Sequence, residues 1–93
     1  MTMQGTLGDI FELRGRGIIA CLERYTGSVV AGDWLCVGER RWEIVGVELS
    51  SEKQRRERAD QGLPPTIGVL LRDASKQEML ALSGQRFETS SAK

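Results

Sequence analysis

The sequence contains no histidine, and this absence removes several kinds of active site. Without histidine, neither a Ser-His-Asp nor a Cys-His arrangement can form, and the commonest general base near neutral pH is missing. The only cysteines, Cys21 and Cys36, are too few to make the usual structural zinc set without histidine. We therefore predict that the protein is not an enzyme, and that it has no catalytic residue, no metal and no cofactor.

Lysine is also scarce, and its placement excludes a phosphate-binding loop. The only lysines are Lys53, Lys76 and Lys93, and none of them follows a glycine. A P-loop needs a lysine directly after a glycine, because the glycine-rich backbone and the lysine hold the phosphates together. We therefore expect that this chain binds no nucleotide by itself.

Long apolar runs are missing as well, and no stretch is long enough to span a membrane. The first residues lack the basic segment followed by an apolar one that is typical of a signal peptide. We therefore expect a cytoplasmic protein with no membrane partner, in which Cys21 and Cys36 stay reduced and act as small apolar fillers. Thirteen basic residues balance thirteen acidic ones, so nucleic-acid binding would depend on a local basic patch.

Glycine, by contrast, is plentiful, and its spacing predicts a small all-β fold. Eleven glycines separate short runs of β-branched and aliphatic residues, as tight turns separate strands. These runs predict strands near 9–14, 17–25, 34–37, 42–49, 66–72 and 86–88. We expect about six antiparallel strands in a small closed β-barrel, because closure removes exposed edges from so small a sheet.

A chain of this length makes a single domain. We expect the barrel to span residues 9–88, between flexible tails at 1–8 and 89–93. Residues 50–62 interrupt the barrel with a highly charged segment that has almost no apolar side chains. That composition predicts either a mobile loop or one short exposed helix. A second short helix is expected near 75–82.

Five short stretches occur in order along most of the chain. They are Asp9-Ile10-Phe11 with Gly15-Arg16-Gly17, Gly27 with Gly32-Asp33 and the following 34–38, Gly46-Val47-Glu48, the strand 67–72, and Lys76-Gln77-Glu78 with Gly84-Gln85. Together they resemble the second-domain β-barrel of translational GTPases such as elongation factor Tu. The resemblance implies a freestanding barrel of this translation-factor type, without the GTPase domain that accompanies it in the family.

In that family the barrel helps to hold the aminoacylated end of transfer RNA. The resemblance implies that Glu48 and Arg72 stand at positions lining that site. Ser50 and Ser51 stand where the family has an aromatic and a basic residue, so the chain departs from the family pattern next to Glu48. From the residues alone, Glu48 and Arg72 suit either a ligand-facing pair or a plain cross-strand ion pair.

The other candidate binding residues are an arginine, a tryptophan and a charged cluster. Arg16, between two glycines, suits either a phosphate contact or a solvated turn. Trp34 alternates out of phase with its apolar neighbours, so we expect it to point outward as an interface anchor, whereas Trp42 is expected to pack. The cluster suits either a solvated surface or a nucleic-acid site; it consists of Lys53, Arg55, Arg56 and Arg58.

These observations leave two classes of function open. The first is a non-catalytic module that binds another protein, either by mimicry of the translation-factor barrel or as a toxin-neutralising immunity protein. The alternative is an RNA-binding accessory protein of translation, which contacts a transfer-RNA end or ribosomal RNA through Arg16, Arg72 and the charged cluster. A third arrangement, assembly with a separately encoded GTPase subunit, follows from the resemblance alone. Steep salt dependence distinguishes phosphate contacts from a tryptophan-anchored protein interface.

Overall fold

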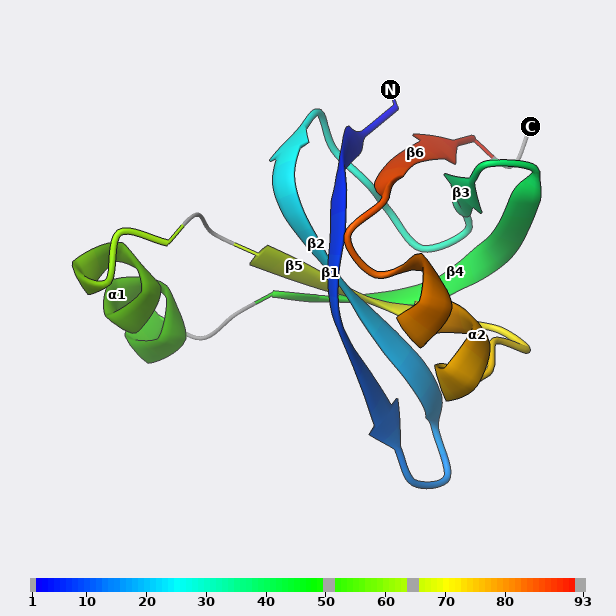
Figure 1. The fold of residues 1–93 in the computed structure, drawn as a ribbon, viewed down its shortest axis with the longest axis horizontal. Helices are drawn as coiled ribbons and strands as arrows, with labels where there is room; N and C mark the ends of the chain where they lie inside the picture. The colour runs from blue at the N-terminus through cyan, green and yellow to red at the C-terminus, as the bar shows by residue number, and fades with distance from the viewer. Residues whose placement is uncertain (1, 50–51, 64–65, 92–93) are drawn as a thin grey trace.

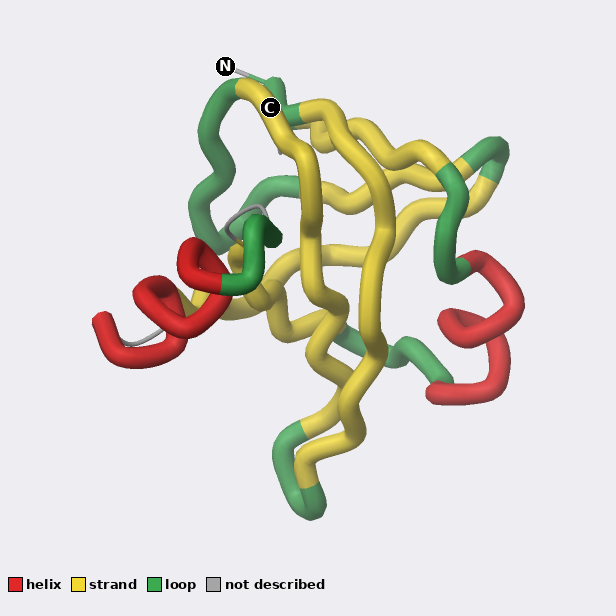
Figure 2. Tube along the Cα trace, turned by 60° about the vertical axis from the view of Figure 1, so that its left-hand side comes forward, coloured by secondary structure: helices red, strands yellow, loops and turns green. Residues whose placement is uncertain are grey.

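Six strands and two short helices make up the computed structural model, which describes residues 2–49, 52–63 and 66–91. The strands are β1 (Gln4–Leu13), β2 (Gly17–Thr26), β3 (Trp34–Val37), β4 (Arg40–Leu49), β5 (Thr66–Leu71) and β6 (Arg86–Ser90). The helices are α1 (Glu52–Asp60) and α2 (Lys76–Leu82), and they lie on opposite sides of the barrel (Figures 1 and 2).

All the strand pairs are antiparallel, in the order β1-β2-β5-β4-β3-β6, and β6 pairs back with β1. The sheet therefore returns on itself as a ring, and the predicted class, a small all-β barrel, is confirmed. The end of the β1–β2 hairpin extends beyond the ring, and Figure 2 shows it as the lowest loop of the molecule. This hairpin and α1 are the two parts of the chain that project from the barrel.

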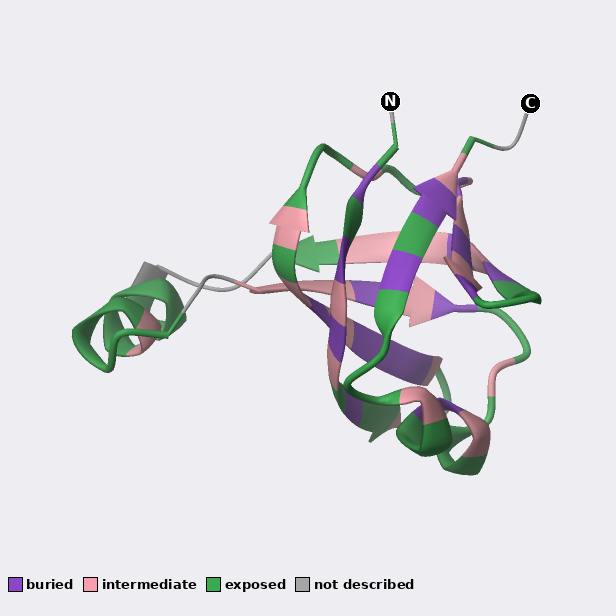
Figure 3. Cartoon of the chain, turned by 45° about the horizontal axis from the view of Figure 1, so that its top comes forward, coloured by how far each residue is buried: buried purple, intermediate pink, exposed green. Residues whose placement is uncertain are grey.

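Buried and exposed side chains alternate along the strands, so that one face of the sheet points into the ring. In β6, Phe87 and Thr89 are buried while Arg86 and Glu88 are exposed, and Figure 3 shows the alternating colours along this strand. The enclosed core consists of Met3, Leu7, Ile10, Ile18, Ala20, Leu22, Leu35, Val37, Trp42, Ile44, Val69, Leu71, Met79 and Phe87. Trp42 is only 7% exposed, so its predicted packing role is confirmed.

Both predicted tails are wrong in extent, because each end of the chain carries part of the ring. β1 already begins at Gln4, and Met3 and Leu7 are fully buried. The Met3 N–H donates to the Thr89 hydroxyl at 2.8 Å, and the Thr89 N–H donates to the Met3 carbonyl at 2.8 Å. The two ends thus hold each other where the ring closes.

The sequence allowed either a mobile loop or a short exposed helix for the charged segment, and the structure contains helix α1 there. From Lys53 to Asp60 every side chain is exposed except that of Arg58, which is half-buried. Packing therefore contributes little to this helix, and its straight-chain Lys, Gln, Arg and Glu side chains favour it intrinsically. The described part of the segment therefore forms one short exposed helix.

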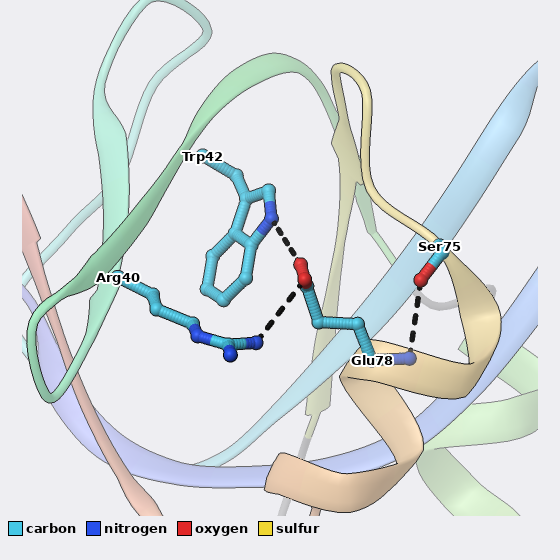
Figure 4. A network of polar contacts seen from close by, with 4 residues as sticks. All are labelled: Arg40, Trp42, Ser75 and Glu78. Atoms are coloured by element: carbon cyan, nitrogen blue, oxygen red, sulfur yellow. Dashed lines mark hydrogen bonds and ion pairs between the residues drawn. The ribbon is translucent and has the colours of Figure 1, made fainter.

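Glu78 fastens helix α2 to the barrel, as Figure 4 shows. Its backbone N–H donates to the hydroxyl of the N-cap residue Ser75 at 3.1 Å. Its carboxylate accepts a hydrogen bond from the Trp42 indole at 3.0 Å and pairs with the Arg40 guanidinium at 3.1 Å. Met79, the next residue, is fully buried in the core. A cap, an apolar anchor and a carboxylate therefore hold this short helix.

We expect Glu78→Ala to lower the free energy of unfolding by about 1–3 kcal/mol, because it leaves a largely buried indole N–H without an acceptor. Glu78→Gln keeps an acceptor for Trp42 and loses only the partly exposed pair with Arg40, so it should cost less than about 1 kcal/mol. Urea unfolding followed by tryptophan fluorescence measures both values. Equal losses would show that the charge of Glu78, rather than the indole hydrogen bond, fastens the helix.

Candidate functional site: a groove between helix α1 and the barrel

A groove of about 410 Å³ lies between α1 and the outer face of the barrel. Its apolar lining consists of Phe11, Ile19 and Leu63, together with the thiol of Cys21. Its other lining residues are Asp9, Glu23, Glu48, Gln54, Glu57, Arg58, Gln61, Thr66 and Gly68. This volume lies within the range of pockets that take small ligands, and it also accommodates a few side chains of a peptide.

Cross-strand pairs build the floor of the groove. Phe11 on β1 lies opposite Ile19 on β2, and Cys21 on β2 lies opposite Gly68 on β5. Phe11 is 51% exposed, whereas Ile19 is only 6% exposed. A Cβ atom built on Gly68 would approach Cγ2 of Ile19 to 3.1 Å. The floor is therefore a partly exposed apolar surface, in which the missing side chain at Gly68 makes room for Ile19.

The turn that ends α1 supplies the opposite apolar wall. The Leu63 N–H donates to the Arg58 carbonyl at 2.8 Å, and the Gly62 N–H donates to the Ala59 carbonyl at 3.0 Å. With Gly62 at a φ of 72°, these two bonds form a Schellman cap. The cap sets the position of Leu63, which is 43% exposed and lines the groove with Phe11.

Carboxylates dominate the charge of the groove. Its lining includes four of them and a single guanidinium; these residues are Asp9, Glu23, Glu48, Glu57 and Arg58. Arg58 lies 3.9 Å from Glu23 and so connects α1 to β2, while Glu48 pairs with Arg16 at 3.0 Å. Within the described part of the chain, Asp9 and Glu57 are in no ion pair. The groove thus carries two acidic groups that no cation of the described residues pairs with.

The thiol of Cys21 lies in the field of these carboxylates. Burial raises the pKa of Cys21, and the nearby charges of Asp9 and Glu23 raise it further, while Arg58 lowers it. Each of the two acidic residues disfavours the thiolate because like charges repel. The floor of the groove is therefore electronegative as well as partly apolar.

We expect the alkylation of Cys21 by iodoacetamide to have a pH midpoint above the ordinary thiol value of 9.0, because only the thiolate reacts. Asp9→Asn should move this midpoint down, since it removes a charge that opposes ionisation. Mass spectrometry of the digested protein follows Cys21 separately from Cys36. An unchanged midpoint in the variant would contradict an electronegative floor.

The same shift has a consequence for stability. A folded-state pKa above the unfolded one means that the native state binds the Cys21 proton more tightly. This contribution to stability is fully present below the unfolded-state pKa and is lost as the pH rises through the folded-state pKa. Stability should therefore fall on the alkaline side of pH 9.0.

Glu48 has a different partner from the one that the sequence suggested. The β4–β5 register places Glu48 opposite Gly68, and Arg72 follows β5 at the other end of this ladder. Arg72 therefore pairs with Glu43, with its Nε 3.1 Å from the carboxylate, and Glu48 pairs with Arg16 from the β1–β2 turn. The Glu48–Arg72 ion pair is thus a wrong prediction, although each residue forms an ion pair with another side chain.

Trp34 and the charged cluster lie in different surroundings. Trp34 points outward from β3 as its alternation predicts, but it is half-buried, and the Arg41 guanidinium lies 5.2 Å from its ring centroid. In the cluster, Arg58 turns to Glu23 on the barrel. The other members, Lys53, Arg55 and Arg56, are exposed on α1 and do not line the groove. The four predicted residues therefore do not form one surface: Arg58 faces the barrel, and the other three are exposed outside the groove.

Sequence reasoning missed most of the groove, including Asp9, Phe11, Cys21, Glu57 and Leu63. Two signals in the sequence point to it. Gly68 interrupts the most apolar strand, and an isolated glycine in a strand often marks a place where another group approaches closely. Phe11 is out of phase with the buried Ile10, so it belongs to the outer face.

In three comparisons with known proteins, no family model, curated protein or solved structure matched this chain. The resemblance to the second-domain barrel of translational GTPases therefore stays a prediction, as do the roles that it implies for Glu48 and Arg72. Neither α1 nor α2 is long and apolar enough to cross a membrane. Among the described residues, no three or more His, Cys, Asp or Glu side chains are grouped so that they could hold a metal ion.

Proposed function

We propose that this protein is a non-catalytic cytoplasmic module that binds another protein through the groove between α1 and the barrel. The observation that supports this function is an apolar floor and an acidic rim on one concave surface. Of the four exposed large apolar side chains among the described residues, two, Phe11 and Leu63, line this groove. Exposed apolar groups that gather in a concave site are typical of binding surfaces.

The charge of the groove favours a protein over RNA. RNA affinity depends on Lys and Arg contacts with phosphates, and four carboxylates beside a single arginine repel phosphates. Two further candidates for RNA contact, Arg16 and Arg72, each pair with a carboxylate of this chain. RNA binding is therefore the less supported alternative.

Affinity capture from a native lysate, with and without ribonuclease, tests the proposal when wild type is compared with groove variants. Leu63→Ser and Phe11→Ser remove apolar surface from the groove. Val30→Ser is the matched control, because Val30 is 62% exposed and does not line the groove. Purified candidate partners are then tested against the same variants, which also identifies the kind of partner.

A partner protein that survives ribonuclease, is lost with both groove variants and is kept by Val30→Ser is the expected result. A yield that depends on intact RNA would favour the RNA-binding alternative. A partner that both groove variants retain would place the interface elsewhere on the barrel, and the proposal would be wrong.

A further inference from the structure

We infer that the groove recognises an extended cationic segment of the partner, in which Lys or Arg side chains flank an apolar one. This inference rests on the proposed function and adds the chemistry of the partner to it. The observation that supports it is the position of two carboxylates: Asp9 on β1 and Glu57 on α1 line the groove from its two sides. The apolar surface of Phe11 and Leu63 lies in the same groove.

The four carboxylates divide into two that are paired and two that are not. Glu23 pairs with Arg58, which ties α1 to β2, and Glu48 pairs with Arg16, which ties the hairpin turn to β4. The Glu23–Arg58 pair connects α1 to the barrel before a partner binds, although a partly exposed pair of this length contributes modestly. Asp9 and Glu57 have no ion pair within the described part of the chain, and they are the groups that a partner's cations reach.

The carboxylates are distributed over separate elements rather than gathered at one point. They come from β1, β2, β4 and α1. A metal ion needs several oxygen ligands that converge within one coordination sphere, and the described acidic residues do not form such a group. Cationic side chains spaced along a peptide, by contrast, reach carboxylates that are well separated. The arrangement therefore fits a peptide and not a single ion.

The apolar floor of the groove matches the apolar side chain of such a peptide. Ile19 lies close to Gly68 and, with the Cys21 thiol beside it, gives the floor an apolar surface against which an apolar side chain of the peptide can lie. Phe11 and Leu63 offer further apolar surface, along which the methylene stems of Lys or Arg can lie while their charged ends reach the rim. Both the apolar and the charged parts of a mixed segment therefore have a place in the groove.

The test uses two capped peptides, Arg-Leu-Arg-Leu-Arg and its acidic counterpart Glu-Leu-Glu-Leu-Glu, titrated into the isotope-labelled 93-residue protein and followed by NMR. The cationic peptide is expected to shift the amide signals of Phe11, Cys21 and Gly68, and the acidic peptide is not. Asp9→Asn/Glu57→Gln should weaken the cationic peptide roughly five- to twenty-fold, because exposed charge pairs contribute modestly. Glu39→Gln/Asp73→Asn makes the same change of charge outside the groove and should keep the wild-type affinity.

Equal binding of the two peptides, shifts confined to other surfaces, or no shift at millimolar cationic peptide would each overturn the inference. Failure of the inference remains distinguishable from failure of the proposed function. If the captured partner is lost with Leu63→Ser but kept by Asp9→Asn/Glu57→Gln, the groove binds a protein without recognising its cations. If neither change affects the partner, both proposals are wrong.

Discussion

Phe87→Ala is expected to lower the free energy of unfolding by about 3–5 kcal/mol, the usual cost of emptying a large aromatic site in a core. Phe87 is only 1% exposed and belongs to the core that the ring encloses. It lies on β6, the strand that joins β3 to β1 and so completes the ring. Because small domains are stable by only about 5–15 kcal/mol, this loss is a large fraction of the total.

The only other phenylalanine, Phe11, supplies a matched control for this substitution. Phe11 lies on the outer face of β1 and is 51% exposed, so Phe11→Ala removes far less buried surface and should cost less than about 1.5 kcal/mol. Urea unfolding followed by tryptophan fluorescence compares the two variants directly. Similar losses would contradict the assignment of Phe87 to the inner face and Phe11 to the outer face.

Gly5→Ala is expected to destabilise the protein by at least about 2 kcal/mol, through overpacking between two strands. A Cβ atom at Gly5 would lie 2.6 Å from the carbonyl oxygen of Glu23, 2.9 Å from Cα of Tyr25 and 2.9 Å from Cε2 of Phe87. Two of these neighbours are backbone atoms of β2, which cannot move without disturbing the β1–β2 ladder. The close approach of these strands therefore requires a residue without a side chain.

Gly46→Ala tests the same substitution where there is room for it. A Cβ atom at Gly46 meets Leu70 at an ordinary contact distance of 3.7 Å. Its effect should stay within about 1 kcal/mol of zero, since the loss of freedom in the unfolded chain offsets small strain. Thermal unfolding followed by circular dichroism ranks the two variants, and a Gly46→Ala variant as unstable as Gly5→Ala would argue against steric crowding as the cause.

The barrel was largely predictable from the sequence, because alternation and glycine turns are local signals. The short helix near 75–82 was predictable for the same reason, since Ser75 caps it and Met79 anchors it. The ends of the chain were not predictable in this way. Small residues such as Gly5 replace apolar ones along the first strand, so its pattern reads as a polar tail even though Met3 and Leu7 are buried.

The groove was much harder to predict, because residues distant in the sequence create it. Local pattern places Phe11 on the outer face, but nothing near it in the sequence indicates that α1 and Leu63 line the same groove. The partner of Glu48 depends on the strand register, which shifts between Ile44 and Gly46. A shift of one position redirects side chains to the other face of a sheet, and propensity alone does not determine it.

The point at which α1 leaves the barrel separates one wall of the groove from the barrel core. The chain departs after Leu49 and returns at Ile67, and these two residues are direct partners in the β4–β5 ladder. A short hairpin turn would satisfy the same ladder, so the barrel core does not depend on the segment that carries one wall of the groove. Under the proposed function, substitutions on α1 would alter which partner is bound while the fold is preserved, and exchanging this segment would be a direct route to new binders on an unchanged scaffold.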